Sequence, residues 1–389
     1  MKTPLEGIRV VELARILAGP WIGQTLSDLG ADVVKVESPD GDDTRTWGPP
    51  FIEEENGQTA AYFHACNRGK RSVTADFSNA EDLEFVKRLI AQSDVLIENF
   101  KVGGLKKYGL DYESLKKINP SLIYCSVTGF GQDGPYAHRA GYDFLIQGMG
   151  GIMDLTGEPD GEPQKIGVAF ADIFTGLYGT IAVQAALHRR SQTGEGEWID
   201  MALLDTQVGV LANQAMNYLS TGNTPKRLGN AHPNIVPYQV FAVKDGHIIL
   251  AVGNDRQFQK FCLATGQKDL ASDERFVRNS DRVANREALT SLLEVVLSKW
   301  ERDTLLVELE KAGVPAGPIN SVEQAMNDPQ ILHRELLVSP LDNEGDRKYL
   351  RTPIKYTNAE LSLNKGVPQL GEHQEEIRQE LERCVKPVV

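Results

Sequence analysis

The first 130 residues alternate short apolar runs with segments of helical spacing. The apolar runs predict buried strands at residues 8–13, 31–37, 72–75, 94–100 and 122–128. Between them, apolar positions recur at helical intervals over residues 21–29 and 80–92. This alternation predicts parallel βαβ units with helices on both faces of one sheet. Ligands of such sheets bind beyond the carboxyl ends of the strands, so we expect a polar site there.

The pattern changes near residue 200 and again after residue 330. A strand over residues 198–201 precedes a helical stretch and then a hairpin that turns at Asp245-Gly246. Helical segments follow, and the last 60 residues hold a β pair and a charged helix. We therefore expect an α/β protein with three parts. These are a large Rossmann-like domain over 1–202 completed by 330–389, a linker helix over 203–228, and a small α+β domain over 229–329.

Composition and charge narrow the class of protein. A chain of 389 residues with 41% hydrophobic content can bury two cores. Its net charge of −13 argues against binding nucleic acid, which requires a basic surface. We also expect no membrane partner, because no apolar run in the sequence approaches the roughly 18 residues of a spanning helix. Four scattered cysteines without a CxxC pair favour a reducing, cytoplasmic location and no metal site.

Two common phosphate-binding motifs are missing from the sequence. No GxGxxG follows the first predicted strand, and no GxxxxGK[ST] occurs anywhere in the chain. Both motifs use backbone N–H groups of a glycine-rich turn to hold phosphates. A dinucleotide-dependent oxidoreductase and a P-loop NTPase are therefore disfavoured, although the fold is of their kind.

One carboxylate lies inside the apolar run of residues 165–176. Asp172 directly precedes a predicted helix over residues 173–188. Ionised carboxylates rarely enter such surroundings unless they cap, pair or react. Asp172 is therefore either the N-cap of this helix or a reactive group, and the local pattern leaves both interpretations open.

Eight short motifs follow one another along essentially the whole chain. They are Pro4-Leu5-Glu6-Gly7, Gly30-Ala31-Asp32-Val33, Asn67-Arg68-Gly69-Lys70-Arg71, Glu98-Asn99-Phe100, Gly129-Phe130-Gly131, Gly141-Tyr142-Asp143, Gly313-Val314-Pro315 and Leu370-Gly371-Glu372. In this order and spacing they resemble the motifs of family III CoA-transferases, the CaiB/BaiF type, a group that includes formyl-CoA, carnitine-CoA and succinyl-CoA transferases. The resemblance implies an interlocked homodimer and no permanently bound cofactor. Coenzyme A thioesters and carboxylic acids would be its substrates.

The resemblance also implies a covalent mechanism centred on Asp172. In this family the aspartate at that position attacks the donor thioester, giving a mixed anhydride and CoA thiolate. The thiolate returns to the aspartyl carbonyl, and the acceptor acid then takes CoA from the resulting enzyme thioester. N–H groups at the helix start are expected to stabilise the developing oxyanion. The cap and the catalytic interpretations of Asp172 are compatible.

A further set of residues is implied to bind CoA. These are Leu17, Ala18, Ser38, Asn67, Lys70, Arg71, Asn99, Phe100, Lys101 and Lys107. Without the resemblance, the basic members, with Arg68 and Lys106 beside them, are equally typical of a solvated edge. Ser38 replaces an arginine that some relatives use near the adenine, and Leu17-Ala18 replaces a glutamine-containing pair of the formyl-CoA enzymes. The second change argues against formate or oxalate as the preferred acid.

Four residues are candidates for the acid substrate: Arg45, Tyr142, Asp143 and His232. Arg45 either pairs with the far carboxylate of a diacid or fixes a loop. His232 is either a substrate ligand or a residue that orders its loop. Its segment, residues 229–238, stands where formyl-CoA enzymes have a longer glycine-rich loop. The chain thus looks closest to succinyl-CoA:dicarboxylate transferases, with glutarate an expected acceptor and formyl-, oxalate- or carnitine-type transfer the alternative.

Two rival functions share this scaffold. An α-methylacyl-CoA racemase needs a base on each face of the α-carbon, and its histidine is replaced here by Tyr142. A neutral tyrosine is a poor base at pH 7. A non-catalytic acyl-CoA-binding protein has no need of Asp172, yet the aspartate stands in an intact Ala-Asp-Ile-Phe-Thr-Gly context. Both rivals are therefore disfavoured.

Overall fold

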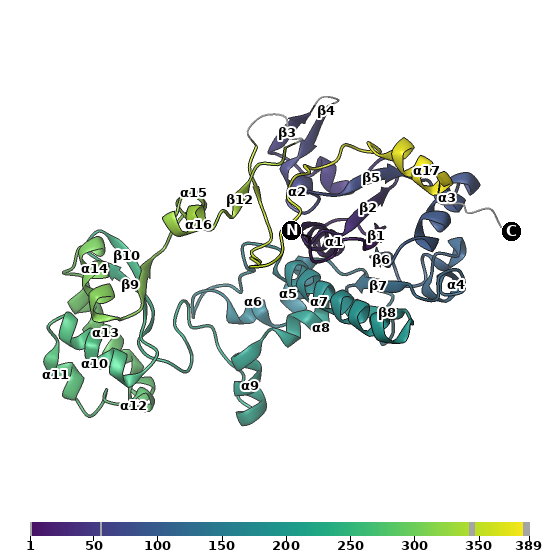
Figure 1. The fold of residues 1–389 in the computed structure, drawn as a ribbon. Helices are drawn as coiled ribbons and strands as arrows, with labels where there is room; N and C mark the ends of the chain where they lie inside the picture. The colour runs from purple at the N-terminus through teal and green to yellow at the C-terminus, as the bar shows by residue number, and fades with distance from the viewer. Residues whose placement is uncertain (1, 55–56, 342–346, 384–389) are drawn as a thin grey trace. The chain divides into compact units, whose positions relative to one another are not determined.

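The chain divides into two compact units, which are described separately. The computed structural model describes residues 2–54, 57–341 and 347–383. Unit 1 comprises Met1–Ile152, Lys165–Ser220 and Gln330–Val389, and unit 2 comprises Met153–Gln164 and Thr221–Pro329 (Figure 1). Residues 203–220, expected in a linker, thus belong to unit 1. The segment of residues 153–164 belongs to unit 2, although it was expected in the large domain.

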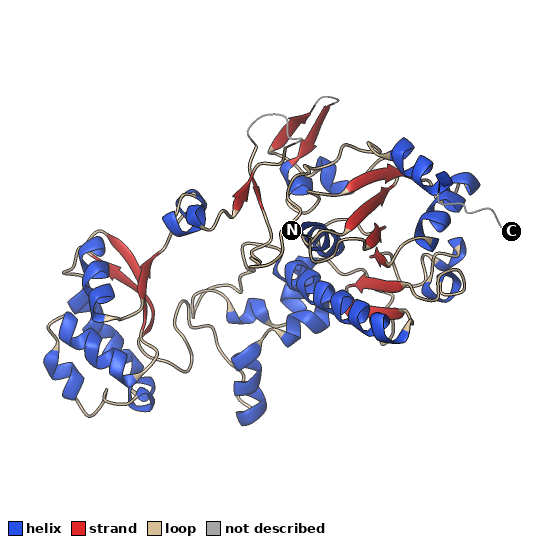
Figure 2. Cartoon of the chain, in the orientation of Figure 1, coloured by secondary structure: helices blue, strands red, loops and turns tan. Residues whose placement is uncertain are grey.

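Unit 1 is built on a six-stranded sheet in the order β5-β2-β1-β6-β7-β8, with every neighbouring pair parallel (Figure 2). Its strands are β1 Arg9–Glu12, β2 Asp32–Glu37, β5 Arg71–Thr74, β6 Val95–Glu98, β7 Ile123–Thr128 and β8 Glu197–Ala202. Each lies within or next to a strand expected from the apolar runs. The expected parallel sheet is confirmed.

Alternation along the strands sends side chains to two separate cores. Val10 packs in a core with helices α1 (Ala18–Asp28) and α7 (Phe170–Thr193). Its neighbour Val11 packs in the other core, with α3 (Ala80–Ala91) and α17 (Gln374–Arg383). Successive side chains of a strand point to opposite faces, so the sheet is covered by helices on both sides.

Helices α1 and α7 approach each other closely through glycine. A Cβ on Gly176 would lie 2.8 Å from Trp21 Cβ, and one on Gly179 would lie 2.5 Å from Ile22 Cδ1. A side chain at Gly176 would also meet the backbone oxygen of Ala18 at 3.0 Å, so glycine there allows the close approach of the two helices. The N-terminal half of α7 is thereby held beside α1.

Helix α7 is long and apolar enough to cross a membrane by length and composition alone. In unit 1 it lies against α1, β7 and β8, and it ends at Gly194, whose φ of 74° is typical of a helix C-terminus. A core helix of a soluble protein meets the same criterion, so the expected absence of a membrane partner stays a prediction.

Several smaller elements complete unit 1. The hairpin of residues 51–60 was not expected from the sequence, and the predicted helix over 203–219 is broken at residues 210–211. The second β pair is reduced to two residues in each strand. These elements are η1 Asp43–Thr46, β3 Phe51–Glu54, β4 Gly57–Ala60, α2 Ala61–His64, η2 Lys106–Tyr108, α4 Tyr112–Leu115, α5 Asp143–Met149, α8 Leu203–Gly209, α9 Ala212–Thr221, β12 Leu337–Val338 and β13 Tyr349–Leu350.

Unit 2 packs helices around a three-stranded antiparallel sheet in the order β11-β10-β9. The expected hairpin is present as β9 Tyr238–Val243 and β10 Gly246–Ala251, and β11 is Ala316–Pro318. Phe241, Phe258 and Leu293 lie in its separate core. Its helices are α10 Asp255–Ala264, α11 Lys268–Ser272, α12 Asn279–Ala284, α13 Arg286–Leu297, α14 Arg302–Ala312 and α15 Val322–Met326, while α6 Ile152–Leu155 and α16 Pro329–His333 lie at the boundaries with unit 1.

Candidate active site

Asp172 lies in the first turn of α7 and lines a cavity of about 520 Å³. Only 8% of the residue is exposed. Burial, and to a smaller degree the charge of Asp143, raises the pKa of Asp172 to about 7. A carboxylate with this pKa is more basic, and therefore more nucleophilic, than an ordinary aspartate, yet a large part of it is ionised at neutral pH.

The N-terminus of α7 is capped by Asp143 and not by Asp172. The helix begins at Phe170, so Asp172 is its third residue, and the expected N-cap role of Asp172 is wrong. Asp143 Oδ1 accepts the N–H groups of Ala171 (2.8 Å) and Asp172 (3.3 Å). N–H groups at the start of this helix were expected to stabilise the oxyanion of the reaction, but these two already donate to Asp143. The Asp172 carboxylate is left free of a capping bond.

Gln147 holds the segment that leads into α7, and sequence reasoning missed it. Its side chain is fully buried. Its Nε2 donates to Asp143 Oδ2 at 2.7 Å, and its Oε1 accepts the N–H of Ile166 at 2.9 Å. Asp143 and Gln147 are one helical turn apart on α5, which is the only sign the sequence offered. The pair fixes the Asp143 carboxylate against α7.

The cavity beside Asp172 brings together residues that follow strands β1, β6 and β7 and residues at the starts of helices α1, α5, α7 and α8. Nine of the residues predicted for the site line it. They are Leu17, Ala18, Asn99, Phe100, Lys101, Lys107, Tyr142, Asp143 and Asp172. The predicted location beyond the carboxyl ends of the parallel strands is therefore where the structure has its cavity.

A second cavity of about 280 Å³ adjoins the first and contains the predicted residue Ser38. The two cavities share Arg15, Phe100 and Tyr108 as wall residues. Phe77 stacks on Phe100 with ring centroids 6.1 Å apart and meets Tyr108 edge-on at 5.6 Å. The shared residues make the two cavities neighbours, and together they are called the groove below: Phe77 and Phe100 line the Ser38 cavity, and Asp172 lines the other.

Three predicted CoA residues lie outside this groove. Lys70 Nζ donates to Glu12 Oε1 at 2.9 Å, to Pro20 O at 2.9 Å and to Asn67 Oδ1 at 2.8 Å, and both Lys70 and Asn67 are buried. All three ammonium donors are thus used inside the protein. Arg71 pairs with Asp32 and with Glu376 and Glu380 of α17. The structure gives these residues internal partners in place of the expected phosphate. The neighbouring Arg68 likewise pairs with Asp28.

Arg45 is buried and its guanidinium binds Glu37 through two parallel hydrogen bonds of 2.8 Å. It also donates to Pro368 O and lies 3.8 Å from the ring centre of Phe63. Arg45 does not line the cavity of Asp172. Of the two interpretations left open by the sequence, the geometry favours the loop-fixing one.

His232 belongs to unit 2 and orders its own loop. Its Nδ1 accepts the N–H of Asn234 at 3.0 Å, and its ring lies against Tyr238 with centroids 5.2 Å apart. Arg286 donates to the carbonyl of His232. Burial, followed by the charge of Arg286, lowers the pKa of His232. These contacts match the loop-ordering interpretation, and a contact with substrate stays a prediction.

Two residues near Asp172 were not found from the sequence. Arg139 lines the cavity, and its guanidinium lies over the rings of Phe130 (5.2 Å) and Tyr136 (4.7 Å). Tyr62, on α2, lies within reach of the Asp172 charge, and burial together with that charge raises the pKa of Tyr62 to about 12. Neither stands in a motif with its neighbours, so only the fold brings them to the site.

The cavity offers a nucleophile and several cations. Among the described residues no cluster of three or more His, Cys, Asp or Glu side chains is placed to hold a metal ion. The positive charges that line the cavity are Arg15, Lys101, Lys107 and Arg139. Arg15 is paired with Asp43 at 2.9 Å. This arrangement suits an anionic ligand whose reacting carbon reaches Asp172.

Replacing Asp143 with asparagine is expected to move the acid limb of the activity profile to lower pH. Asparagine keeps an oxygen for the α7 N–H groups but removes the negative charge that helps to raise the pKa of Asp172. Asp172 then ionises at lower pH, and the ionised form is the nucleophile. The measurement is kcat/KM against pH. Asp111→Asn, at the N-cap of α4, is the matched control; an unmoved Asp143→Asn profile would contradict the coupling.

Comparison with known proteins assigns the chain to a family. The sequence profile described as CoA-transferase family III matches residues 5–374. The chain belongs to CoA-transferase family III. It is 55% identical over 385 residues to the succinate–glutarate CoA-transferase of Agrobacterium fabrum, covering 98% of this chain and 96% of that protein. It is 40% identical to the human succinyl-CoA:glutarate CoA-transferase, covering 98% and 86% of the two chains.

A solved structure confirms the fold of this family III CoA-transferase. The crystal structure of a CaiB/BaiF family protein from Brucella suis is 66% identical and superposes with a TM-score of 0.88, covering 98% of this chain and 100% of that one. The expected family, the mixed α/β fold and the CoA-transferase activity are thus confirmed. Coenzyme A thioesters are its co-substrates, and the racemase and binding-protein alternatives are set aside.

Proposed function

We propose that this enzyme moves CoA from succinyl-CoA to glutarate or a similar dicarboxylate, with Asp172 as the covalent nucleophile. The observation that carries the proposal is the buried Asp172, free of a cap and facing a cation-lined cavity. The relatives named above act, by their names, on succinate or succinyl-CoA and glutarate. The chain is also 38% identical to an acetyl-CoA:oxalate CoA-transferase from Acetobacter aceti, which is less than its identity to either of the two glutarate enzymes.

The chemistry follows from the environment of Asp172. The ionised carboxylate attacks the thioester carbonyl of succinyl-CoA, the C–S bond breaks, and a mixed anhydride and CoA thiolate form. The thiolate attacks the aspartyl carbonyl and releases succinate. A glutarate carboxylate then attacks the aspartyl thioester, the C–S bond breaks, and a second mixed anhydride and CoA thiolate form. The thiolate attacks the glutaryl carbonyl, which yields glutaryl-CoA and frees the Asp172 carboxylate. Burial penalises the charged carboxylate, so the neutral acyl intermediates are favoured relative to it.

The groove offers a place for each part of the CoA molecule. The aromatic end beside Ser38, formed by Phe77 and Phe100, suits the adenine ring. Lys101 and Lys107 line the adjoining cavity and suit the phosphates. The pantetheine arm then runs past Leu17 toward Asp172. Lys70 and Arg71 are left out of this assignment because their charges are already paired.

The second carboxylate of a diacid needs a cation if it is buried. Arg139 lines the cavity of Asp172, and no acidic side chain in the described part of the chain pairs with it. The rings of Phe130 and Tyr136 hold its guanidinium in place. We assign the far carboxylate to Arg139 and not to Arg45.

Assaying the enzyme with succinyl-CoA and a panel of acids tests the proposal. We expect glutarate and other longer diacids to be used at least about tenfold better, by kcat/KM, than monoacids of equal length, because their far carboxylate can pair with the Arg139 guanidinium and the end of a monoacid cannot. In parallel, hydroxylamine added after succinyl-CoA should leave a hydroxamate on Asp172, seen by peptide mass. Preference for formate, oxalate or carnitine over every longer diacid would contradict the substrate class.

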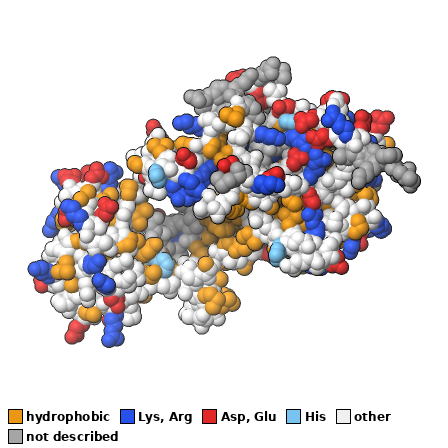
Figure 3. Space-filling view, viewed as in Figure 1, with side chains coloured by type: hydrophobic (Ala, Val, Ile, Leu, Met, Phe, Trp, Pro, Cys, Tyr) orange, Lys and Arg blue, Asp and Glu red, His pale blue; other side chains and the backbone are white. Residues whose placement is uncertain are grey.

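We also propose that the enzyme is a homodimer. Helix α9 has no buried residue, yet it carries Met216, Tyr218 and Leu219, each at least half exposed. On α7, Ile181 is 61% exposed. Hydrophobic side chains gather near α9 in the space-filling view (Figure 3). An apolar face of this kind is typical of a surface that another chain covers.

Light scattering at micromolar concentration tests the oligomeric state. We expect a mass of twice 42.9 kDa, independent of dilution over the assay range, because a large apolar interface dissociates slowly. A monomer under these conditions would contradict the proposal. The substitution Leu219→Glu is expected to weaken the dimer, whereas Glu195→Gln, on the exposed loop after α7, is the control.

We propose a cytoplasmic location as well. Cys66, Cys125 and Cys262 are free and buried, and no disulfide joins them. Burial raises the pKa of the Cys66 thiol to about 12, so the thiol stays protonated and inert. Free thiols of this kind support a reducing compartment.

A further inference from the structure

The turn between β1 and α1 contains a strained residue that lines the active-site cavity. Ile16 has φ = 72°, in the left-handed region that β-branched residues rarely adopt. Arg15, Ile16 and Leu17 are consecutive wall residues of the cavity that holds Asp172. A strained conformation persists only where its surroundings impose it. The question is which contacts impose this one.

Side chains from other elements bind the backbone of this turn. The N–H of Ile16 donates to the Asp42 carboxylate at 3.2 Å and 3.3 Å. Arg15 is held at both backbone groups by the Asn99 amide, at 2.9 Å and 2.7 Å. Lys35 Nζ donates to the carbonyl of Ala14 at 2.8 Å. The turn is thus fixed from β2, η1 and the end of β6.

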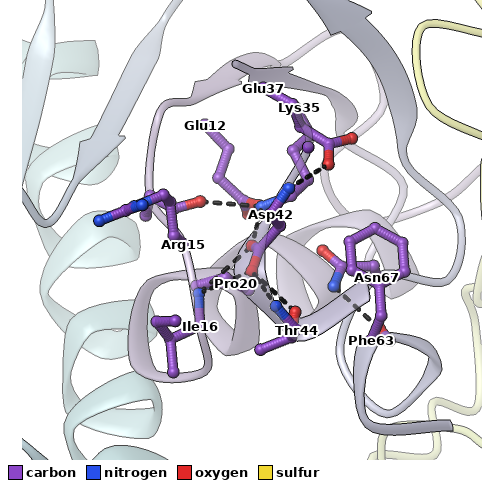
Figure 4. A network of polar contacts seen from close by, with 12 residues as sticks. Glu12, Arg15, Ile16, Pro20, Lys35, Glu37, Asp42, Thr44, Phe63 and Asn67 are labelled. Atoms are coloured by element: carbon purple, nitrogen blue, oxygen red, sulfur yellow. Dashed lines mark hydrogen bonds and ion pairs between the residues drawn. The ribbon is translucent and has the colours of Figure 1, made fainter. Parts of the chain in front are cut away.

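Asp42 is itself fixed by a buried network of charges (Figure 4). Lys35 Nζ lies 3.0 Å from Asp42 Oδ2 and 3.2 Å from Glu12 Oε1, and Lys70 closes the network on Glu12 at 2.9 Å. The side chains of these four residues are at most 1% exposed. Two cations balance two carboxylates, so the network is neutral. Charges buried in this way hold their partners to one geometry.

We propose that Asp42 is a positioning residue for CoA binding, which holds Ile16 in its left-handed conformation and so sets the cavity wall formed by Arg15, Ile16 and Leu17. Lys35 fixes Asp42, and both residues also line the second cavity. A loss of CoA binding caused by a direct contact of Asp42 with the ligand would not be repaired by Ile16→Gly, so the double variant below separates that contact from an effect through the turn. This inference rests on the proposed use of a CoA thioester in the cavity. Asp42 also accepts from Thr44 N and Thr44 Oγ1 at the start of η1. A purely structural role, as the cap of η1, is the alternative to be tested.

The deciding experiment combines Asp42→Asn with Ile16→Gly. Oδ1 of Asp42 accepts from Ile16 and Thr44, while Oδ2 faces Lys35. Asparagine has one oxygen, so either its NH₂ group is turned toward the Lys35 ammonium or the bonds at the Oδ1 position are lost. In both orientations a buried contact of the network that holds the turn is broken. Glycine adopts a positive φ without strain. The substitution Ile16→Gly should therefore make the clamp from Asp42 dispensable. If Asp42 acts only as the cap of η1, Ile16→Gly will not restore the CoA binding that Asp42→Asn loses.

The readout is the Kd for CoA itself, measured by calorimetry, together with KM and kcat for succinyl-CoA. We expect Asp42→Asn to weaken CoA binding at least about tenfold and to raise KM more than it lowers kcat. The double variant should bind CoA within about threefold of Ile16→Gly alone, as non-additive partners do. Asp28→Asn breaks the buried pair with Arg68 away from the cavity and should leave the Kd unchanged.

Each other outcome overturns the inference or a different claim. A folded Asp42→Asn enzyme with wild-type Kd overturns the positioning role, and so does a double variant that binds CoA as poorly as Asp42→Asn. If Asp42→Asn does not fold, the double variant decides. A double variant that also fails to fold shows that Asp42 is needed for the core, and it overturns the inference. A double variant that folds and binds CoA supports the inference. A wild-type enzyme that does not bind CoA overturns the proposed function instead.

Discussion

Replacing Asp172 with alanine or asparagine should lower the rate of CoA transfer by at least about a thousandfold, because no other side chain in residues 167–176 is placed to form the acyl intermediate. Thr175 is the only other oxygen nucleophile in residues 167–176. It is fully buried, and its Oγ1 has no hydrogen-bond partner in the described part of the chain. No base is therefore placed to activate it. Steady-state transfer from succinyl-CoA to glutarate is the measurement.

Stability provides the control for this loss of activity. The pKa of Asp172 is raised in the folded enzyme from near 3.8 to about 7, mainly by burial. The folded state therefore holds the proton more tightly than the unfolded state, and wild-type stability falls as pH rises through this range. Asp172→Asn removes the buried charge. We expect it to unfold at a higher temperature than wild type at pH 8, with the difference vanishing near pH 4.

The two measurements together separate mechanism from folding. A stable Asp172→Asn protein that binds CoA but transfers none shows that only chemistry was lost. A variant that keeps more than a few per cent of wild-type activity would remove Asp172 from the mechanism. A variant less stable than wild type at pH 8 would show that the carboxylate makes a native contact that the structure lacks.

Periodicity and spacing predicted the parts of the fold that depend on local pattern. The six parallel strands were found because each is an apolar run between turn residues, and the β9–β10 hairpin because Asp245-Gly246 permits its turn. The β12–β13 pair was expected but is shorter than predicted, and the break between α8 and α9 was not expected. Those features depend on contacts with distant segments, which local periodicity does not record.

The residues of the site likewise divide into those that a local motif predicted and those whose role depends on contacts with distant segments. Asn99 and Lys101 follow the end of β6 and Asp172 lies at the start of α7, each in a motif that the resemblance implied for the site, and all three line the cavity. The fate of Lys70 depends on Glu12, which is 58 residues away, and that of Arg71 depends on Glu380, 309 residues away. A basic side chain that binds a phosphate and one that binds a distant carboxylate look alike in sequence. Only the fold shows which carboxylates are near.

The capping of α7 gives a second example. The sequence placed one carboxylate at the helix start and suggested that it was the cap. The structure uses Asp143 from α5 for that purpose, 29 residues before Asp172. Because the cap comes from elsewhere, the carboxylate on the helix is available to react. Two acidic groups with different tasks are thus held side by side, which is a common arrangement at sites where pKa values are shifted.

Arg45→Met should destabilise the enzyme by about 3–5 kcal/mol at pH 7, because it leaves the buried Glu37 carboxylate without its bidentate partner. Burial opposes the charged form of Glu37, but hydrogen bonding from Arg45 and the charge of Lys35 outweigh it, so the pKa of Glu37 is lowered. A lowered pKa contributes stability above the unfolded value near 4.5, and that contribution is lost as pH falls. Urea unfolding at pH 7 and pH 4 is the measurement. The difference between wild type and Arg45→Met should shrink at the lower pH.

The same variant decides between the two roles that the sequence allowed for Arg45. Arg189→Met removes an exposed pair with Glu195 and should change stability by less than about 1 kcal/mol, which makes it the matched control. Because Arg45 faces Glu37 and not the cavity, the surviving folded Arg45→Met enzyme should keep the wild-type ratio of kcat/KM for glutarate over a monoacid of equal length. An Arg45→Met protein that is as stable as wild type but selectively loses activity with dicarboxylates would instead place Arg45 on the substrate. A guanidinium that recognises the far carboxylate contributes to the ratio of kcat/KM for diacid over monoacid and not to the stability of the fold.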